Sequence, residues 1–307
     1  VFRFAAAAAH AGLPLDGRSL RMLASRGVAP GEDWTENTLR AFVSLLGAGP
    51  AVVPTVEALE RYDLFSRYLP EWRVVRSLPQ RNAFHTFTVD HHLLETVANA
   101  SAFVRDVGRP DLLLLGALMH DLGKGHPGDH TEVGVGLVDA VAARMGLPDD
   151  DREVVRSLVA LHLLLPETAT RCDLSDPRTA QLVAEAVGDL ATLQLLRALT
   201  EADSKATGPA AWSAWKQSLL DELIVASSGV LAGLDAAPRV SPVARHLERM
   251  AGVVGGSPAT VHIEHEDLGD VEVLRTASSD RAGLFATIAG VLALHGLDVV
   301  AAAAATS

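Results

Sequence analysis

The feature that most constrains this chain is an unbroken apolar run, Leu112–Met119, that ends directly on His120 and Asp121. Such a run predicts a helix buried on nearly all sides, which Gly123 and the next glycine then end. An imidazole and a carboxylate are costly to bury unless they are neutralised, paired or bound to a metal. Both groups are good ligands for a divalent cation. For this pair alone, the competing explanation is a helix C-terminus with a solvated aspartate.

Polar residues on other apolar helices favour the metal. His92 lies near the start of a helix predicted over about 88–107, and Asp203 lies late in one predicted over about 190–207, after apolar neighbours on the same face. His162 falls on the apolar stripe of a helix predicted over about 152–165, which Pro166 should end. Helical bundles build metal sites by pointing such side chains inward from facing helices. His130 adds a further donor, and Lys124 and Asp129 border the predicted site.

The remaining segments up to residue 235 also indicate helices. Residues 1–80 contain short helices, among them Thr38–Leu46 and Val56–Tyr68, for which we expect a packing role only. Further helices are predicted over about 131–145 and 177–188, and around Trp212, Trp215 and Leu219, with Lys216 exposed. The fold class predicted is therefore mainly α.

Imidazole and carboxylate donors without thiolates suit Mg, Mn, Zn or Fe. A catalytic site would leave coordination positions open, so that a bound water is acidified and can attack a phosphorus. Two metals sharing Asp121 could also clamp the phosphate. In this scheme Lys124 or His126 stabilises the transition state or protonates the leaving group.

Composition excludes several other classes of protein. The net charge is −12, with only three lysines and no basic block, which argues against nucleic-acid binding. The single cysteine, Cys172, excludes an internal disulfide and a multi-cysteine zinc site, and fits a reducing cytoplasm. Because no apolar run approaches the length of a membrane span and no signal peptide is visible, we expect a cytoplasmic protein without a membrane partner.

The tail after residue 235 differs in kind. Residues 236–258 are rich in Ala, Pro, Ser and Gly and predict a linker, interrupted by a short helix over about 242–251. A strand over 271–276, a loop, a helix over 284–295 and a second strand over 297–305 predict a βαβ unit. With too few strands to close a sheet, the sequence looks cut off inside a domain.

The order H…HD…H…H…D resembles the HD superfamily of metal-dependent phosphohydrolases. The resemblance narrows further in the motifs TVDHHLLET, LLGALMHDLGKGHPGDHTEVG, LVALHLLLPETATRCDLSDP and ADSKATGPAAWSAWKQSLL, spread over residues 88–220. These are similar to the bifunctional uridylyltransferase/uridylyl-removing enzymes of bacterial nitrogen regulation, as is the preceding ALERYDLFSRYLPEW. The tail resembles the first ACT domain of that family. The resemblance covers most of residues 55–307.

This resemblance implies an all-helical HD domain over 81–235 that follows the end of a transferase-linked helical region over 1–80, and a truncated α+β ACT domain over 259–307. It implies hydrolysis of a nucleotidyl group from a tyrosine of the signalling protein PII, regulated by glutamine. The implied metal ligands are His92, His120, Asp121, His130, His162 and Asp203. His91 matches a variable position and is left out. The implied effector loop contains Asp280, Arg281, Gly283 and Leu284.

The sequence departs from the family in one respect. The transferase signature, a Gly-Ser turn followed by paired aspartates on a strand, is absent, so the chain as given should remove nucleotides and not add them. Whether the group is UMP or AMP stays open. Two alternatives also stay open: another HD hydrolase, such as a guanosine tetraphosphate hydrolase, and a non-enzymatic glutamine-responsive module whose metal only holds the bundle together.

Overall fold

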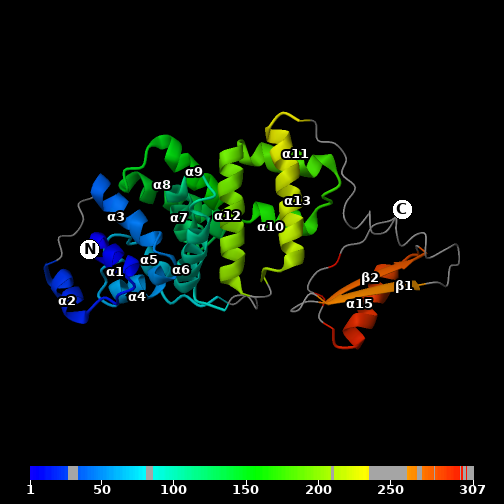
Figure 1. Ribbon diagram of the computed structural model, residues 1–307, viewed down its shortest axis with the longest axis horizontal. Helices are drawn as coiled ribbons and strands as arrows, with labels where there is room; N and C mark the ends of the chain where they lie inside the picture. Colours follow the sequence, from blue (N-terminus) through cyan, green and yellow to red (C-terminus); the bar gives the residue numbers. More distant parts are fainter. Residues whose placement is uncertain are drawn as a thin grey trace.

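The computed structural model describes residues 1–26, 34–80, 86–208, 211–234, 261–267, 272–279, 281–297, 299 and 302. Helices dominate this part of the chain, and its only sheet has two strands, so the predicted mainly α class is confirmed. Figure 1 shows the helices as one body, with the strands β1 and β2 and helix α15 beside it.

The described residues before 80 form five α-helices: α1 (Phe2–His10), α2 (Gly17–Arg26), α3 (Glu36–Leu46), α4 (Val52–Glu60) and α5 (Trp72–Val75), with the short 3-10 helix η1 (Gly49–Ala51) before α4. The prediction for α3 is confirmed. The helix predicted over Val56–Tyr68 is wrong at both ends. Helix α4 begins earlier, at Val52, and it ends at Glu60 because Asp63 adopts a positive φ of 54° that a continuing helix excludes. Buried Glu60 instead accepts a hydrogen bond from the Ser66 amide at 2.9 Å and fixes a compact turn.

The centre of the body consists of α6 (Val89–Ala100), η2 (Ser101–Phe103), α7 (Pro110–Met119), α8 (His130–Arg144), α9 (Asp149–Leu161) and α12 (Leu190–Thr207). Every residue of Leu112–Met119 is buried, as the apolar run predicted. Helix α7 contacts α3, α6, α9 and α12, which surround it (Figure 1). Helix α6 ends at Ala100, before the predicted 107, because the chain passes into η2.

Three further helices pack beside α12: α10 (Leu164–Arg171), α11 (Pro177–Val187) and α13 (Ala214–Leu231). Pro166 does not end the helix before it. Helix α9 already ends at Leu161, and Pro166 lies in the first turn of α10, where its missing N–H leaves no helical bond unmade. Lys216 is half-buried, because its Nζ donates to the Ala211 carbonyl at 3.1 Å, so its predicted exposure was wrong.

One hydrophobic core joins these helices. Its buried side chains run from Phe2 to Leu223 and include α1, α3, α6, α7 and α12, so the core continues across residue 80. The domain boundary predicted there stays a prediction. No single helix in the described ranges is both long and apolar enough to cross a membrane; α3 with η1 and α4 passes such a test only as a pair bent by 112°.

The tail contains β1 (Val261–Asp267), β2 (Glu272–Ser278) and α15 (Leu284–Leu294). The two strands pair antiparallel, with Val261 opposite Ser278. The predicted helix and the first predicted strand are confirmed, but the order is ββα over the described residues, because β1 was missed. Most of the second predicted strand, the predicted linker and the helix over 242–251 lie outside the described residues.

Candidate metal centre

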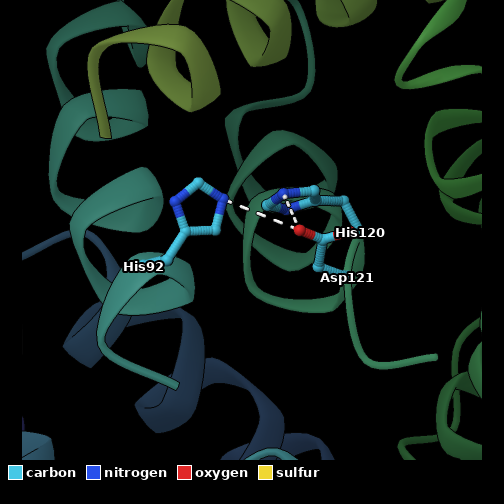
Figure 2. A group of neighbouring side chains, drawn as sticks. All are labelled: His92, His120 and Asp121. Atoms are coloured by element: carbon cyan, nitrogen blue, oxygen red, sulfur yellow. Dashed lines mark ion pairs between the residues drawn. The ribbon is translucent and has the colours of Figure 1, made fainter. Parts of the chain in front are cut away.

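The structure brings His92 and His120 to one oxygen of Asp121. Asp203 lies beside these two histidines. His92 Nε2 lies 3.7 Å from Asp121 Oδ2, and His120 Nε2 lies 3.4 Å from the same oxygen. Asp203 Oδ1 lies 3.0 Å from His92 Nε2 and 3.6 Å from His120 Nε2. Figure 2 shows the imidazoles of His92 and His120 directed at the Asp121 carboxylate. The four residues come from α6, the turn after α7, and α12.

A second pair of histidines lies on the other oxygen of the same carboxylate. His130 Nε2 lies 3.7 Å from Asp121 Oδ1, and His162 Nε2 lies 3.8 Å from it. Two sets of candidate ligands therefore meet at Asp121: His92 and His120 on one side, and His130 and His162 on the other. A carboxylate shared in this manner by two sets of ligands suits a pair of neighbouring divalent cations.

Backbone hydrogen bonds orient two of the imidazoles. His120 Nδ1 lies 2.9 Å from the Ala117 carbonyl, and His162 Nδ1 lies 2.8 Å from the Val159 carbonyl. A carbonyl oxygen only accepts, so Nδ1 must be the donor in each ring and Nε2 is directed at Asp121. Metal-binding histidines are commonly held in this manner by their second nitrogen.

Two glycines allow α8 to approach the turn after α7. A Cβ on Gly123 would lie 1.9 Å from the His130 carbonyl oxygen and 2.7 Å from the Gly134 amide nitrogen, which no side chain can do. Gly134 in turn faces Gly123 across this contact. The close approach brings His130, the first residue of α8, to Asp121. Asp129 caps the same helix and accepts hydrogen bonds from the Thr131 and Glu132 amides.

The electrostatics of the cluster are those of buried charges that stabilise one another. Burial opposes the charged form of His120, but the carboxylates of Asp121 and Asp203 outweigh it and raise the pKa of His120 to about 10. Burial would also raise the pKa of Asp121 and of Asp203; the neighbouring imidazoles and, for Asp121, Lys124 hold both well below the ordinary value. Burial and the charge of His120 lower the pKa of His162.

These residues fit a divalent cation by an independent criterion. His120 Nε2 and Asp121 Oδ1 are buried and have no hydrogen-bond partner among the described residues. A buried polar atom without a partner costs about 1–3 kcal/mol, so two at one point indicate a ligand. Nitrogen and carboxylate oxygen donors without sulfur suit the harder divalent cations.

Lys124 is the predicted catalytic residue with a contact to the cluster. Its Nζ lies 2.5 Å from Asp121 Oδ2. His126 follows two residues later; no ion pair joins its ring to the cluster within the described ranges, and its role stays a prediction. His91, next to His92, faces away and pairs with Glu57 at 3.0 Å and Glu95 at 3.3 Å.

The predicted effector loop lies in the tail, outside this cluster. Gly283 has a φ of +79° and is the N-cap residue of α15, and the Leu284 amide donates to the Arg281 carbonyl at 3.1 Å. Positive φ is a conformation that glycine adopts without strain. Asp280 lies outside the described residues.

Comparison with known proteins defines the class first. Residues 89–207 match the family model of the HD domain. This range includes every predicted metal ligand, from His92 to Asp203. The helical body thus contains an HD domain, and the candidate metal centre lies within it.

The particular relatives are bifunctional uridylyltransferase/uridylyl-removing enzymes. The chain is 44% identical over 97% of its length to that enzyme of Streptomyces coelicolor, and equally so to that of Mycobacterium tuberculosis H37Rv. It is 42% identical over 69% of its length to the Corynebacterium glutamicum enzyme. The chain is therefore homologous to this family, as its motifs indicated. It spans 40%, 36% and 31% of the three relatives, respectively.

Proposed function

We propose that the chain is the part of a bifunctional PII-modifying enzyme that removes the nucleotidyl group, UMP or AMP, from a tyrosine of PII by metal-dependent hydrolysis. The observation that carries the proposal is the meeting of two sets of candidate ligands, all buried except the half-buried His130 and Asp203, at the Asp121 carboxylate. The relatives' name, which includes uridylyl removal, supplies the substrate class.

Each ligand has a separate role in this scheme. His92, His120 and Asp203 would hold one cation with Asp121 Oδ2, and His130 and His162 would hold a second with Asp121 Oδ1. When bound, divalent cations supply an acidified water and a positive charge beside the phosphate oxygens. The rigid positions of His120 and His162, fixed through their Nδ1 atoms, keep the ligand atoms aligned during the reaction.

Two residues would act on the phosphate and the leaving group. The Lys124 ammonium already lies at the edge of the Asp121 carboxylate, where a phosphate oxygen would approach the metals. Its charge would stabilise the negative charge that builds up on the phosphorus oxygens. The leaving tyrosinate needs a proton, for which Lys124 and His126 are the candidates.

The test is release of UMP from uridylylated PII with Mn²⁺ or Mg²⁺ present. We expect the parent chain and the His91→Ala variant to release UMP, and the His92→Ala variant to lose most of its activity. Positions 91 and 92 are adjacent histidines, but only His92 faces Asp121. Adenylylated PII and guanosine tetraphosphate serve as further substrates.

The outcomes separate the alternatives. Release of AMP from adenylylated PII alone would identify the nucleotide. Release of pyrophosphate from guanosine tetraphosphate, with no release of nucleoside monophosphate from PII, would identify the chain as a guanosine tetraphosphate hydrolase. A metal-loaded chain that hydrolyses none of the three substrates would leave only the non-enzymatic module.

We also propose that glutamine regulates this activity through the tail, as part of an ACT domain. The left-handed Gly283 directly before α15 supports this proposal, because turns with such a residue can form concavities of backbone amides that bind a small ligand. Calorimetric titration with glutamine should release or absorb heat in the parent chain and not in a Gly283→Val variant, whose backbone cannot hold the turn. Titration of the parent chain without heat would contradict this part of the proposal alone.

A further inference from the structure

A segment that precedes the matched HD domain reaches the metal centre. Gln80 lies nine residues before the start of the match at residue 89, yet its Oε1 accepts a hydrogen bond from Lys124 Nζ at 2.9 Å. The same ammonium contacts Asp121 Oδ2. Lys124 is thus shared between a candidate metal ligand and a neutral amide on a separate segment.

Three independent contacts hold this segment in place. The Ser77 amide donates to Asp90 Oδ2 at 2.9 Å, and the Val89 amide donates to the Leu78 carbonyl at 2.9 Å. A Cβ on Gly125 would lie 2.8 Å from the Leu78 side chain, so the segment packs directly on the turn that carries Lys124. The segment that leads to Gln80 is therefore held against both α6 and the turn that carries Lys124.

The orientation of the Gln80 amide is also determined. An ammonium only donates, so it must face the carbonyl oxygen of the amide. The amide nitrogen then faces the Phe87 carbonyl, 3.5 Å away. Glutamine has one acceptor for Lys124 and one donor for the Phe87 carbonyl, so it satisfies both neighbours. Glutamate at this position would accept from Lys124 but would have no donor for the Phe87 carbonyl.

A cation bound at Asp121 would change the balance of forces on Lys124. The carboxylate would share its negative charge with the cation, and the cation would repel the ammonium at close range. Gln80 Oε1 already accepts from the ammonium, and a neutral amide oxygen competes less well for the cation than the carboxylate does, so it stays available to Lys124.

We propose that Gln80 is a positioning residue. When a divalent cation binds Asp121 and displaces Lys124, the ammonium stays hydrogen-bonded to Gln80 and so remains beside the reacting phosphate. This rests on the proposed function for the role of the phosphate, and on the structure alone for the competition between Lys124 and the cation. It assigns to the metal centre a residue outside the HD domain.

The test is a double-mutant cycle with Mn²⁺ alone as the probe, without any substrate. Calorimetry would measure Mn²⁺ affinity in the parent chain and in the variants Gln80→Ala, Lys124→Ala and Gln80→Ala/Lys124→Ala. Without Gln80 the displaced ammonium loses its amide acceptor and has to be solvated by water, so we expect Mn²⁺ to bind about 5- to 10-fold more weakly, the effect of one hydrogen bond. Lys124→Ala should tighten binding, and adding Gln80→Ala to it should have no further effect.

Two matched variants sharpen the result. Gln80→Glu supplies a charged acceptor that draws Lys124 from Asp121, and it should bind Mn²⁺ at least as tightly as the parent chain. Gln181→Ala, on the exposed side of α11, should bind Mn²⁺ like the parent chain. Circular dichroism checks that each variant is folded.

An equal loss of affinity from Gln80→Ala with and without Lys124, or no loss in either background, would overturn the proposal. Because no substrate is used, a failure to hydrolyse nucleotidylated PII would not affect this result. Conversely, an absent coupling between Gln80 and Lys124 would leave the proposed hydrolase activity standing.

Discussion

Replacing Asp121 by alanine should abolish metal binding between His130 and His162, weaken it among His92, His120 and Asp203, and lower hydrolysis by more than about 100-fold. Loss of a partner behind a metal ligand typically costs about 10- to 100-fold, and Asp121 is itself the candidate ligand that both sets share. The other five candidate ligands remain, but His130 and His162 keep no carboxylate between them, and His92 and His120 keep only that of Asp203. Elemental analysis and the rate of UMP release measure the two effects.

Asp139→Ala is the control for this substitution. Asp139 lies on the exposed side of α8 and its carboxylate is 4.0 Å from Arg156, away from the cluster. We expect unchanged metal content and rate in this variant. If Asp121→Ala binds two equivalents of metal like the parent chain, the bridging role of Asp121 is wrong. If it loses the metal and hydrolyses at the parent rate, the metal is structural.

Replacing Gly123 by alanine should destabilise the fold by at least about 3 kcal/mol. The new methyl group would lie 1.9 Å from the His130 carbonyl oxygen, which belongs to the backbone and cannot rotate away. Insertion of one carbon into a packed core commonly costs about 1–3 kcal/mol, and a backbone contact this close lies at the upper end or beyond. Urea unfolding measures the loss.

The matched control is Gly136→Ala, on the same helix that Gly123 contacts. Gly136 is exposed in α8, and an added Cβ there meets nothing within 4 Å. Alanine favours the helix over glycine by about 0.5–1 kcal/mol, so this variant should be slightly more stable than the parent chain. Equal stabilities of the two variants would show that α8 does not approach the turn through Gly123.

Much of the helical body could be predicted because its apolar pattern is strong. Leu112–Met119 is apolar at every position, and α12 has clear end signals at Asp189 and Gly208, so both helices were predicted closely. The end of α9 was missed because Leu163, Leu164 and Leu165 continue the apolar run past the break. The predicted end was placed at Pro166 because proline commonly ends a helix, but proline is also tolerated in the first turn of one, which is where Pro166 lies.

The candidate ligands could be predicted because histidine and aspartate are rare on buried helix faces. The sequence also indicated that Lys124 borders them, since it lies three residues from Asp121. The division of the ligands between the two carboxylate oxygens depends on angles between helices, which no local pattern records. Gln80 gave no signal, because it lies in the irregular stretch Leu78-Pro79-Gln80 and a neutral amide there has no distinguishing spacing.

The tail shows a different limit. Strand β1 reads VHIEHED, in which charged residues and histidines weaken the alternation that marks a strand. Its antiparallel partner β2 alternates more clearly and was predicted. Pairing between the two strands stabilises β1 despite its polar sequence, and such pairing is a tertiary property.

The most direct test of the shared metal centre is an anomalous difference map from crystals grown with Mn²⁺. The arrangement of ligands predicts two peaks, one on each side of the Asp121 carboxylate: the first among His92, His120 and Asp203, and the second between His130 and His162. A map in which Mn²⁺ is bound elsewhere, with no peak at coordination distance from Asp121, would contradict the account.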